Sequence, residues 1–406
     1  MNTQRLNYLI DIRRKIHNNP ELGYQEKETT ELICSELEKL NLPYQKNVAR
    51  TGAIATLKKG EGPCIALRAD IDALPVKEET NLSFASHKTM LNAEGKATSV
   101  MHACGHDIHT TILLGAAAEL SETEFNGTVK FIFQPSEEGC YDDTEHKSGG
   151  QRIVEGGALD DVSAALGLHV FPAITTGVLA YVPGEAFGNM SFFTFKITGE
   201  AAHAGMEPEK GKDSIVVAMQ FIQQAQLIVS RLTAQTEPSV ISFTQINGGL
   251  NHNIIAPDVT LRGTIRTLSV ETYKIILRKL EELIKGLELI YGVQISMNID
   301  LYYPSVLNDI SVHDTLNSSL QEIFGKQNII EMKPMLAGED FSFFSRKVPS
   351  MFYFLGARDE SVPAYSLHHP KVVFNEACIP YGIGLMVSGA KALLKSYRTV
   401  RGTIAV

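Results

Sequence analysis

Two short stretches of the chain hold an unusual number of side chains that can bind a metal ion. The first runs from Met101 to His109, and the second runs from Gln134 to Glu138. Together they contain one thiol, three imidazoles and three carboxylates. Transition metals such as zinc are bound in proteins by thiolate, imidazole and carboxylate groups. The two stretches therefore predict a metal centre.

Four side chains from three segments could supply the ligands. Cys104 and His106 are two residues apart and can reach one metal from a loop, and Glu138 and His169 follow or close apolar runs that read as neighbouring strands. Taken alone, each of these residues would more often be a buried packing residue or an ordinary surface residue than a metal ligand. A cysteine nucleophile activated by a histidine is an alternative, but it leaves Glu137 without a role.

The adjacent carboxylates of Glu137 and Glu138 could also form a solvated acidic turn. They follow Gln-Pro at the end of an apolar run, however, where a buried pair of negative charges needs a counter-charge. A metal centre supplies that charge, so one glutamate can bind metal while the other acts as a base.

Other polar residues leave two readings open. Asp70 and Asp72 could orient metal-bound imidazoles, or Asp70 and Asp72 could form a structural salt bridge with Arg68. His203 follows a predicted strand and could be an ordinary loop histidine. The pair His368 and His369 does not reveal which imidazole points inward.

Length and charge narrow the classes of function. A chain of 406 residues exceeds the roughly 250 to 300 residues at which a single core stops growing, so we expect at least two domains. The net charge is −9, and no block of Lys and Arg is present, which argues against nucleic acid and anionic membranes as partners. We therefore expect a small molecule or a peptide as the substrate.

Cysteine usage and the N-terminus indicate the cytoplasm. Five widely spaced cysteines are poor material for a disulfide framework and suggest a reducing compartment. The N-terminal stretch becomes charged before an apolar segment could act as a signal peptide, and no uninterrupted run approaches the about 18 apolar residues of a membrane span.

The first part of the chain predicts an α/β domain with a mostly parallel sheet flanked by helices. Residues 5–17 and 26–40 have helical periodicity, and a further helix is expected over 110–120, after the ligand stretch. Apolar runs without alternation, typical of strands buried on both faces, lie at 53–57, 65–67, 129–133 and 164–168. Ligands of such sheets bind beyond the carboxyl ends of the strands.

From about residue 189 the pattern becomes strand, helix, strand, strand, helix, strand, which is the ferredoxin-like arrangement. Asp213 is expected to cap the first of these helices, and Ser269 precedes the second. The apolar stripe of the first helix is expected to comprise Ile215, Met219, Ile222, Gln226 and Val229. We therefore predict a discontinuous catalytic domain, residues 1–185 and 304–406, with an inserted lid, residues 186–303.

Eight motifs, in order, resemble the di-metal amidohydrolases that include N-acyl-amino-acid amidohydrolases, hippurate hydrolase and the plant auxin-conjugate hydrolases. The resemblance covers nearly the whole chain and implies a zinc-exopeptidase-like catalytic domain. The motifs are Leu67-Arg-Ala-Asp-Ile-Asp-Ala-Leu-Pro75, His102-Ala-Cys-Gly-His-Asp107, Phe133-Gln-Pro-Ser-Glu-Glu138, Gly167-Leu-His-Val170, Ala202-His-Ala204, Gly263-Thr-Ile-Arg266, Gly338-Glu-Asp-Phe341 and Leu367-His-His-Pro370.

The resemblance also implies roles for individual residues. Glu137 would be the general base, and His203 would stabilise the oxyanion on the scissile carbonyl. Asn253 and Arg266 would hold the free carboxylate of the substrate, and for Arg266 the period-2 pattern also indicates the open face of the lid sheet. The implied ligands of two divalent ions (Zn, Mn, Ni or Co) are Cys104, which would bridge them, with His106, Glu138, His169 and His368.

Two features depart from the family pattern. A polar insertion, Cys140 to Gln151, follows Glu138 and contains Asp142, Asp143, Glu145 and His146; we expect a solvated loop, although it could reshape the pocket. His369 stands where the family often has a small residue.

The sequence thus predicts a metal-dependent amidohydrolase that releases a free amino acid and a carboxylic acid from N-acyl amino acids or related small conjugates. A dipeptidase or carboxypeptidase on the same scaffold is the alternative among enzymes. A non-catalytic metal- or ligand-binding protein is the alternative outside enzymes, but binding alone would not need Glu137. Open edge strands of the lid sheet, together with the resemblance, predict a homodimer through the lid.

Overall fold

The computed structural model describes residues 2–139 and 144–403 and divides into two compact units. The first unit comprises Met1–Gly184, Leu307–Lys333 and Asp340–Val406, and the second comprises Glu185–Val306 and Pro334–Glu339. The segment Pro334–Glu339, which the sequence analysis left in the catalytic domain, groups with the second unit. Its Met335 accepts a hydrogen bond from the amide of Gly188 and donates one to Ala186.

An eight-stranded sheet forms the centre of the first unit, in the order β1-β2-β6-β3-β7-β16-β8-β15. The inner pairs β6–β3, β3–β7 and β7–β16 are parallel, whereas β1 and β2 form an antiparallel edge. The mostly parallel α/β sheet is therefore confirmed. Its strands are Tyr44–Val48 (β1), Gly52–Lys59 (β2), Cys64–Asp70 (β3), Gly127–Gln134 (β6), Ala164–Thr175 (β7), Leu179–Tyr181 (β8), Ile329–Glu331 (β15) and Ser350–Arg358 (β16).

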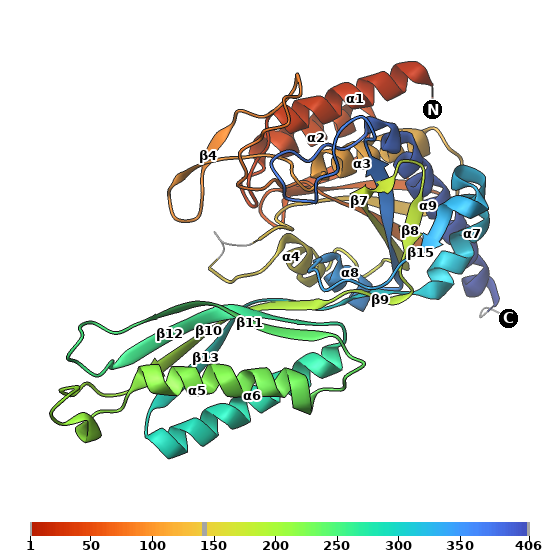
Figure 1. Cartoon of the computed structure of the whole chain (residues 1–406). Coiled ribbons are helices and arrows are strands. Elements are labelled where there is room, and N and C mark those ends of the chain that lie inside the picture. The colour runs from red at the N-terminus through yellow and green to blue at the C-terminus, as the bar shows by residue number, and fades with distance from the viewer. Residues whose placement is uncertain (1, 140–143, 404–406) are drawn as a thin grey trace. The chain divides into compact units, whose positions relative to one another are not determined.

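Helices cover both faces of this sheet because its inner strands are apolar on both sides. Figure 1 shows α4 and α8 on the opposite side of the sheet from α1 and α3. Residue Leu67 on β3 and Leu113 on α3 have no exposed surface. The helices are Thr3–Asn18 (α1), Lys27–Lys39 (α2), His106–Ser121 (α3), Gly149–Glu155 (α4), Ile310–Phe324 (α7), Phe341–Lys347 (α8) and Ile379–Thr403 (α9).

Two small strand pairs lie outside the two larger sheets. The hairpin of β4 (Thr89–Leu91) and β5 (Ala97–Ser99) precedes the ligand stretch in the first unit. Strands β9 (Gly184–Phe187) and β14 (Val306–Asn308) lie at the first two of the four junctions between the units along the chain.

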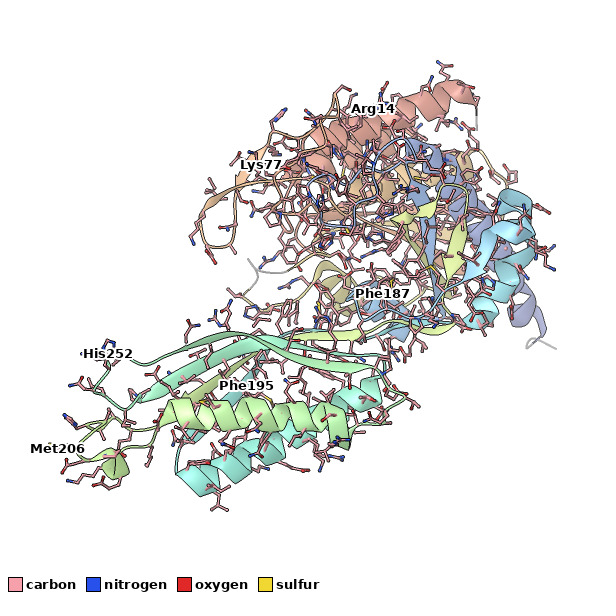
Figure 2. All side chains as sticks on the ribbon, viewed as in Figure 1. Arg14, Lys77, Phe187, Phe195, Met206 and His252 are labelled. Carbon is pink, nitrogen blue, oxygen red and sulfur yellow. The ribbon has the colours of Figure 1, made fainter. Side chains whose placement is uncertain are left out.

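The second unit has the predicted ferredoxin-like topology. Its four antiparallel strands follow the order β11-β12-β10-β13, and helices α5 and α6 pack on one face (Figure 1). Phe195 lies within this core and is fully buried (Figure 2), as the alternating pattern of β10 predicts. The elements are Asn189–Thr198 (β10), Ser214–Leu227 (α5), Ser239–Gly248 (β11), Asp258–Thr267 (β12), Val270–Tyr291 (α6) and Gln294–Tyr303 (β13).

The predicted cap of α5 is present, and Ser269, which was expected only to precede α6, caps that helix, but the buried stripe of α5 was predicted wrongly. Asp213 accepts hydrogen bonds from the amides of Ile215 and Val216, and Ser269 accepts one from Thr272. Met219, placed in the stripe, is 63% exposed. Apolar residues surround most of this helix, so periodicity alone could not select the buried face. The residues of α5 that are buried are Ser214, Val217, Ala218, Phe221 and Ala225.

Two described helical segments, Ser214–Leu232 and Glu376–Arg398, are long and apolar enough to cross a membrane by length and composition alone. Each contributes to the hydrophobic core of its own unit, through residues such as Phe221 and Leu393 that have no exposed surface. Core helices pass the same test, so the two segments give little support to a membrane span.

Candidate metal centre and active site

The predicted ligand stretch lies at the start of α3, and this helix begins earlier than predicted. We expected the helix from residue 110, with the ligands on the preceding loop, but it begins at His106. Gly105 adopts a left-handed conformation (φ 87°) immediately before it, and a Cβ at this position would lie 2.4 Å from a methyl group of Val170. Glycine therefore permits the sharp entry that brings Cys104 and His106 together.

Cys104 is the point at which two distant segments meet. Its Sγ lies 3.2 Å from Nε2 of His169 and 3.3 Å from Nε2 of His368. His169 lies in the middle of β7, not at the end of the strand as predicted, because β7 continues to Thr175. His368 has a left-handed backbone (φ 67°), and its amide donates to the carbonyl of Ala103, which fastens it beside the thiol.

The two remaining predicted ligands join the same cluster. Oε1 of Glu138 lies 3.1 Å from Nε2 of His368 and 3.9 Å from Nε2 of His106. Donor atoms of Cys104, His106 and His169 lie within 4.8 Å of one another, as do those of Cys104, Glu138 and His368. A third such group contains Glu137 with His106 and Glu138. The structure thus brings all five predicted ligands and the predicted base together within the first unit.

The electrostatics of this cluster fit a metal centre. Nε2 of His106 is buried and has no hydrogen-bond partner, which is costly for a polar atom unless an ion binds there. Burial and the carboxylates of Glu138 and Glu137 raise the pKa of the Cys104 thiol. Burial opposes protonation of His106, yet carboxylates led by Asp70 raise the pKa of this imidazole to about 10. Divalent cations would neutralise this excess of negative charge.

Asp70 and Asp72 contact imidazoles of the ligand stretch, and Asp70 also pairs with Arg68, so both roles that the sequence left open occur. Oδ1 of Asp72 lies 3.2 Å from Nδ1 of His106, and Oδ2 accepts a hydrogen bond from the amide of Glu138. Asp70 binds Nδ1 of His109 at 2.5 Å and also forms an ion pair with Arg68 at 2.7 Å. Both carboxylates therefore orient the ligand segments, and one of them has the structural salt bridge as well.

A buried network behind β3 was not foreseen. Nη2 of Arg68 lies 2.8 Å from Oδ1 of Asp340, and Nε of Arg68 donates to Gln134. Gln134 and the amide of Gly150 also donate to Asp340. Asp340 belongs to the motif Gly338–Phe341, which the sequence analysis quoted without assigning a role. A buried counter-charge for Arg68 was the signal that could have identified it.

A second unforeseen network fastens α1 to the first turn of α3. Nε of Arg13 lies 2.8 Å from Oδ2 of Asp107, and Nδ1 of His17 lies 2.8 Å from the same oxygen. Nε2 of His17 contacts Glu78 at 3.1 Å. Burial opposes ionisation of Asp107, but the charges of Arg13 and His17 hold the pKa of this carboxyl well below its usual range. The side chains around the ligands are therefore held by fixed charges.

The three remaining predicted site residues lie in the second unit and differ in burial. His203 and Asn253 are exposed and neighbours, since the amide of Ala204 donates to the carbonyl of Asn253. Figure 2 shows the nearby Met206 and His252 in loops at one end of this unit. Arg266 is half-buried on β12, where it donates to Thr264 and lies over the ring of Phe192 at 5.7 Å.

The two departures from the family pattern lie differently in the structure. Cys140, Asp142 and Asp143 are outside the described residues, whereas Glu145 is exposed and pairs with Lys147. His369 stacks on Tyr365, with 4.3 Å between ring centroids, and its Nδ1 accepts a hydrogen bond from the amide of Lys371. His369 is therefore engaged away from the thiol that His368 contacts.

The α/β sheet and the buried thiol, imidazole and carboxylate cluster beside it define a metal-dependent hydrolase. The model of peptidase family M20/M25/M40 matches residues 66–392, and the chain belongs to this family. The protein is accordingly an amidohydrolase of the M20 type, as the resemblance implied.

Relatives of known description agree with this assignment. The chain is 36% identical to the IAA-amino acid hydrolase ILR1-like 4 of Arabidopsis thaliana, over 95% of this chain and 86% of the relative. It is 35% identical to an N-acetylcysteine deacetylase of Bacillus subtilis, over 91% and 93%. Among solved structures, the Bacillus subtilis YXEP protein, a dinuclear metal binding peptidase from the M20 family, has a TM-score of 0.81 at 29% identity, covering 98% of this chain and 100% of its own.

Proposed function

We propose that the protein hydrolyses the amide bond of N-acyl amino acids or related small conjugates and releases a free amino acid and a carboxylic acid. The observation that carries the proposal is the cluster of Cys104, His106, Glu138, His169 and His368 with Glu137 beside it, which is buried except for the half-exposed His368 and the partly buried Glu138. The relatives named for hydrolysis of IAA-amino acids and of N-acetylcysteine support the substrate class.

The five donors would hold two divalent metal ions, as the solved relative described as dinuclear suggests. Such ions polarise a carbonyl and lower the pKa of water. Glu137 would take the proton of the attacking water and deliver it to the departing amine nitrogen. It is only 7% exposed, which shields this proton transfer from bulk solvent. Zn, Mn, Ni and Co are the candidate metals, and elemental analysis of the purified protein distinguishes them.

Recognition of the amino-acid part would fall to the second unit. The guanidinium of Arg266 can form a bidentate pair with the free carboxylate of the substrate, and Asn253 would assist it. His203 would stabilise the oxyanion of the tetrahedral intermediate. Burial lowers the pKa of Arg266, but guanidinium remains charged at every working pH and keeps its attraction for an anion.

A substrate panel with metal analysis tests this function. N-acetyl and N-benzoyl amino acids should release free amino acid, and a chelator should abolish the release. Cleavage of a dipeptide panel without cleavage of the N-acyl panel would favour the dipeptidase. Ligand binding without turnover of either panel, lost on chelation, would favour a non-catalytic binding protein.

We also propose that the second unit forms a homodimer. Strand β11 is at the edge of its sheet and leaves one side of its backbone open for pairing. Gln226 of α5 donates to the carbonyl of Ile241 on β11, so helix and edge strand form one surface. Large apolar side chains exposed on these two elements are Ile215, Val216, Met219, Leu227, Val240 and Ile246.

Sedimentation of the full chain tests the dimer. Met219→Asp should shift a dimeric mass towards the monomer, because a charge in an apolar interface is poorly solvated. Leu289→Asp is the matched control, since Leu289 is 87% exposed on α6, away from β11 in sequence and fold. A monomeric wild type at working concentration, or equal dissociation in both variants, would contradict the proposal.

A further inference from the structure

A cavity of about 160 Å³ in the first unit adjoins the ligand cluster and has no role in the chemistry described above. Two of the residues that line it, Asp72 and Glu138, belong to the candidate metal centre or orient it. The others come from the loop after α1, the segment after β3, the β4–β5 hairpin and, for Gly139, the segment after β6. They are Leu22, Gly23, Gln25, Ala73, Leu74, Pro75, Asn92, Ala93 and Gly139.

Packed residues and a hydrogen bond between segments form the wall and floor of the cavity. Leu22 and Ala73 pair as an isolated bridge and pack with Val100 and Met90 at the base of the hairpin. Nε2 of Gln25 donates to the carbonyl of Leu91 at 3.2 Å, which ties the hairpin to the loop after α1. The hairpin is therefore fixed to the floor, so the volume is defined by packed elements.

A close approach of two backbones forms another part of the lining. A Cβ on Gly23 would lie 2.9 Å from the carbonyl oxygen of Gly139 and 2.9 Å from Oγ of Ser136. Glycine at position 23 thus allows the loop after α1 to lie against the segment that carries Glu137 and Glu138. The cavity and the candidate base are consequently built on the same short segment.

The charges of the lining select which end of a substrate can enter. No Lys or Arg is among the described residues that line the cavity, whereas two carboxylates are. The free carboxylate of an N-acyl amino acid would be repelled there, but an uncharged acyl chain would meet the side chains of Leu22, Ala73 and Leu74. We propose, resting on the function proposed above, that this cavity is the acyl-group pocket and that the β4–β5 hairpin sets the size of the acyl group.

The volume limits the acyl group that fits. An apolar cavity of about 150 Å³ is sufficient to bind benzene. The pocket has a comparable volume but is open at one side, so it matches the size of a single six-membered ring, and a bicyclic indole would extend beyond it. We expect benzoyl and hexanoyl conjugates to be preferred over indole-3-acetyl conjugates of the same amino acid.

Substitution at the hairpin tests this pocket with the full-length, metal-loaded protein. Ala93 lines the cavity and is exposed, so Ala93→Trp fills the volume without disturbing a core. It should lower the ratio of kcat/KM for N-benzoylalanine to that for N-acetylalanine at least about tenfold, since a single methylene in an apolar pocket is worth about this factor. Leu91→Trp is the matched control, because Leu91 is 60% exposed on the same hairpin but does not line the cavity. Leu74→Ala should raise the ratio of kcat/KM for indole-3-acetylalanine to that for N-acetylalanine, because it enlarges the cavity.

Calorimetric binding of the free acids gives a readout independent of turnover. Benzoate should bind the wild type more tightly than acetate, and Ala93→Trp should weaken benzoate binding by the same factor. If no conjugate is hydrolysed but benzoate binding still depends on Ala93, the proposed function fails and the pocket stands. If Ala93→Trp hydrolyses the panel with the wild-type acyl preference, the pocket is overturned and the function stands. Absence of both hydrolysis and binding overturns both.

Discussion

The first unit buries its candidate chemical groups, except for the half-exposed His368, and fastens them to one another, whereas the second unit presents two of its three on exposed loops. His106 and Asp107 have no exposed surface, and each contacts further charged residues. His203 and Asn253 are exposed and have mainly local backbone partners. Fixed geometry suits bond cleavage, and adaptable surface groups suit recognition of a ligand. Substitutions in the first unit should therefore lower mainly kcat, whereas substitutions of the substrate-binding residues in the second unit should raise mainly KM.

The largest effect should come from the first unit. Glu137→Gln removes the proposed base while keeping its shape, and kcat should fall by about 10² to 10⁴, the usual contribution of general base catalysis. Metal content, measured by elemental analysis, should stay at the wild-type value. The exposed Glu145 provides the control variant Glu145→Gln. Full hydrolytic activity of Glu137→Gln with metals bound would remove the proposed mechanism.

In the second unit, a smaller effect should appear mainly in KM. Arg266→Ala should lower kcat/KM by about 10 to 10², because a hydrogen bond to a charged group contributes about 1.5 to 3 kcal/mol. Arg262→Ala is the matched control, four residues away on the same strand face. Initial rates with a substrate and with its carboxamide, which lacks the negative charge, measure the effect. Equal losses on both compounds, or in both variants, would contradict a carboxylate-binding role.

A buried acid beneath the site should affect stability. Burial and the nearby Asp72 raise the pKa of Glu26 to about 8, whereas the unfolded value is 4.5. The folded state therefore binds the proton more tightly, so stability falls as pH rises from about 4.5 to about 8. Glu26→Gln should reduce this fall, with a gain on the order of a few kcal/mol at pH 9 and little change at pH 4.5. Urea unfolding of the metal-free protein at the two pH values would show the difference, and equal pH dependence of both proteins would refute it.

The smallest effect is expected at His369. Its ring stacks on Tyr365, whereas His368 contacts Glu138 and is the proposed ligand. His369→Ala should change kcat/KM by less than about threefold, in keeping with a substitution outside the reacting groups. His368→Ala, compared by metal content, should lose bound metal. Comparable metal loss in the two variants would show that the ligand was assigned to the wrong imidazole.

Periodicity and motif order were sufficient for the sheet, the ferredoxin-like unit and the convergence of five donors. They failed where side-chain direction depends on tertiary packing. Met219 was placed on the buried face because α5 is apolar around most of its circumference. It is exposed because packing on the sheet selects another face. His106 lies in α3 because Gly105 allows a left-handed entry that propensity alone does not reveal.

The supporting charges could not be predicted from spacing. Arg13 and Asp107 are far apart in sequence, and their contact exists only after α1 packs against α3. The acyl pocket similarly combines segments around Leu22, Ala73 and Ala93. A single sequence identifies groups that chemistry needs, but the partners that hold them are set by the three-dimensional packing of distant segments.

The interrupted course of the first unit has a consequence for biosynthesis. Strand β7 lies before the second unit in sequence, but its parallel partner β16 follows it, and so does the proposed ligand His368. The nascent chain must therefore complete the second unit before the central sheet can close, and long-range parallel pairing is slow. The full set of proposed ligands exists only after residue 368 has left the ribosome, so metal loading is expected to be a late step in the maturation of this enzyme.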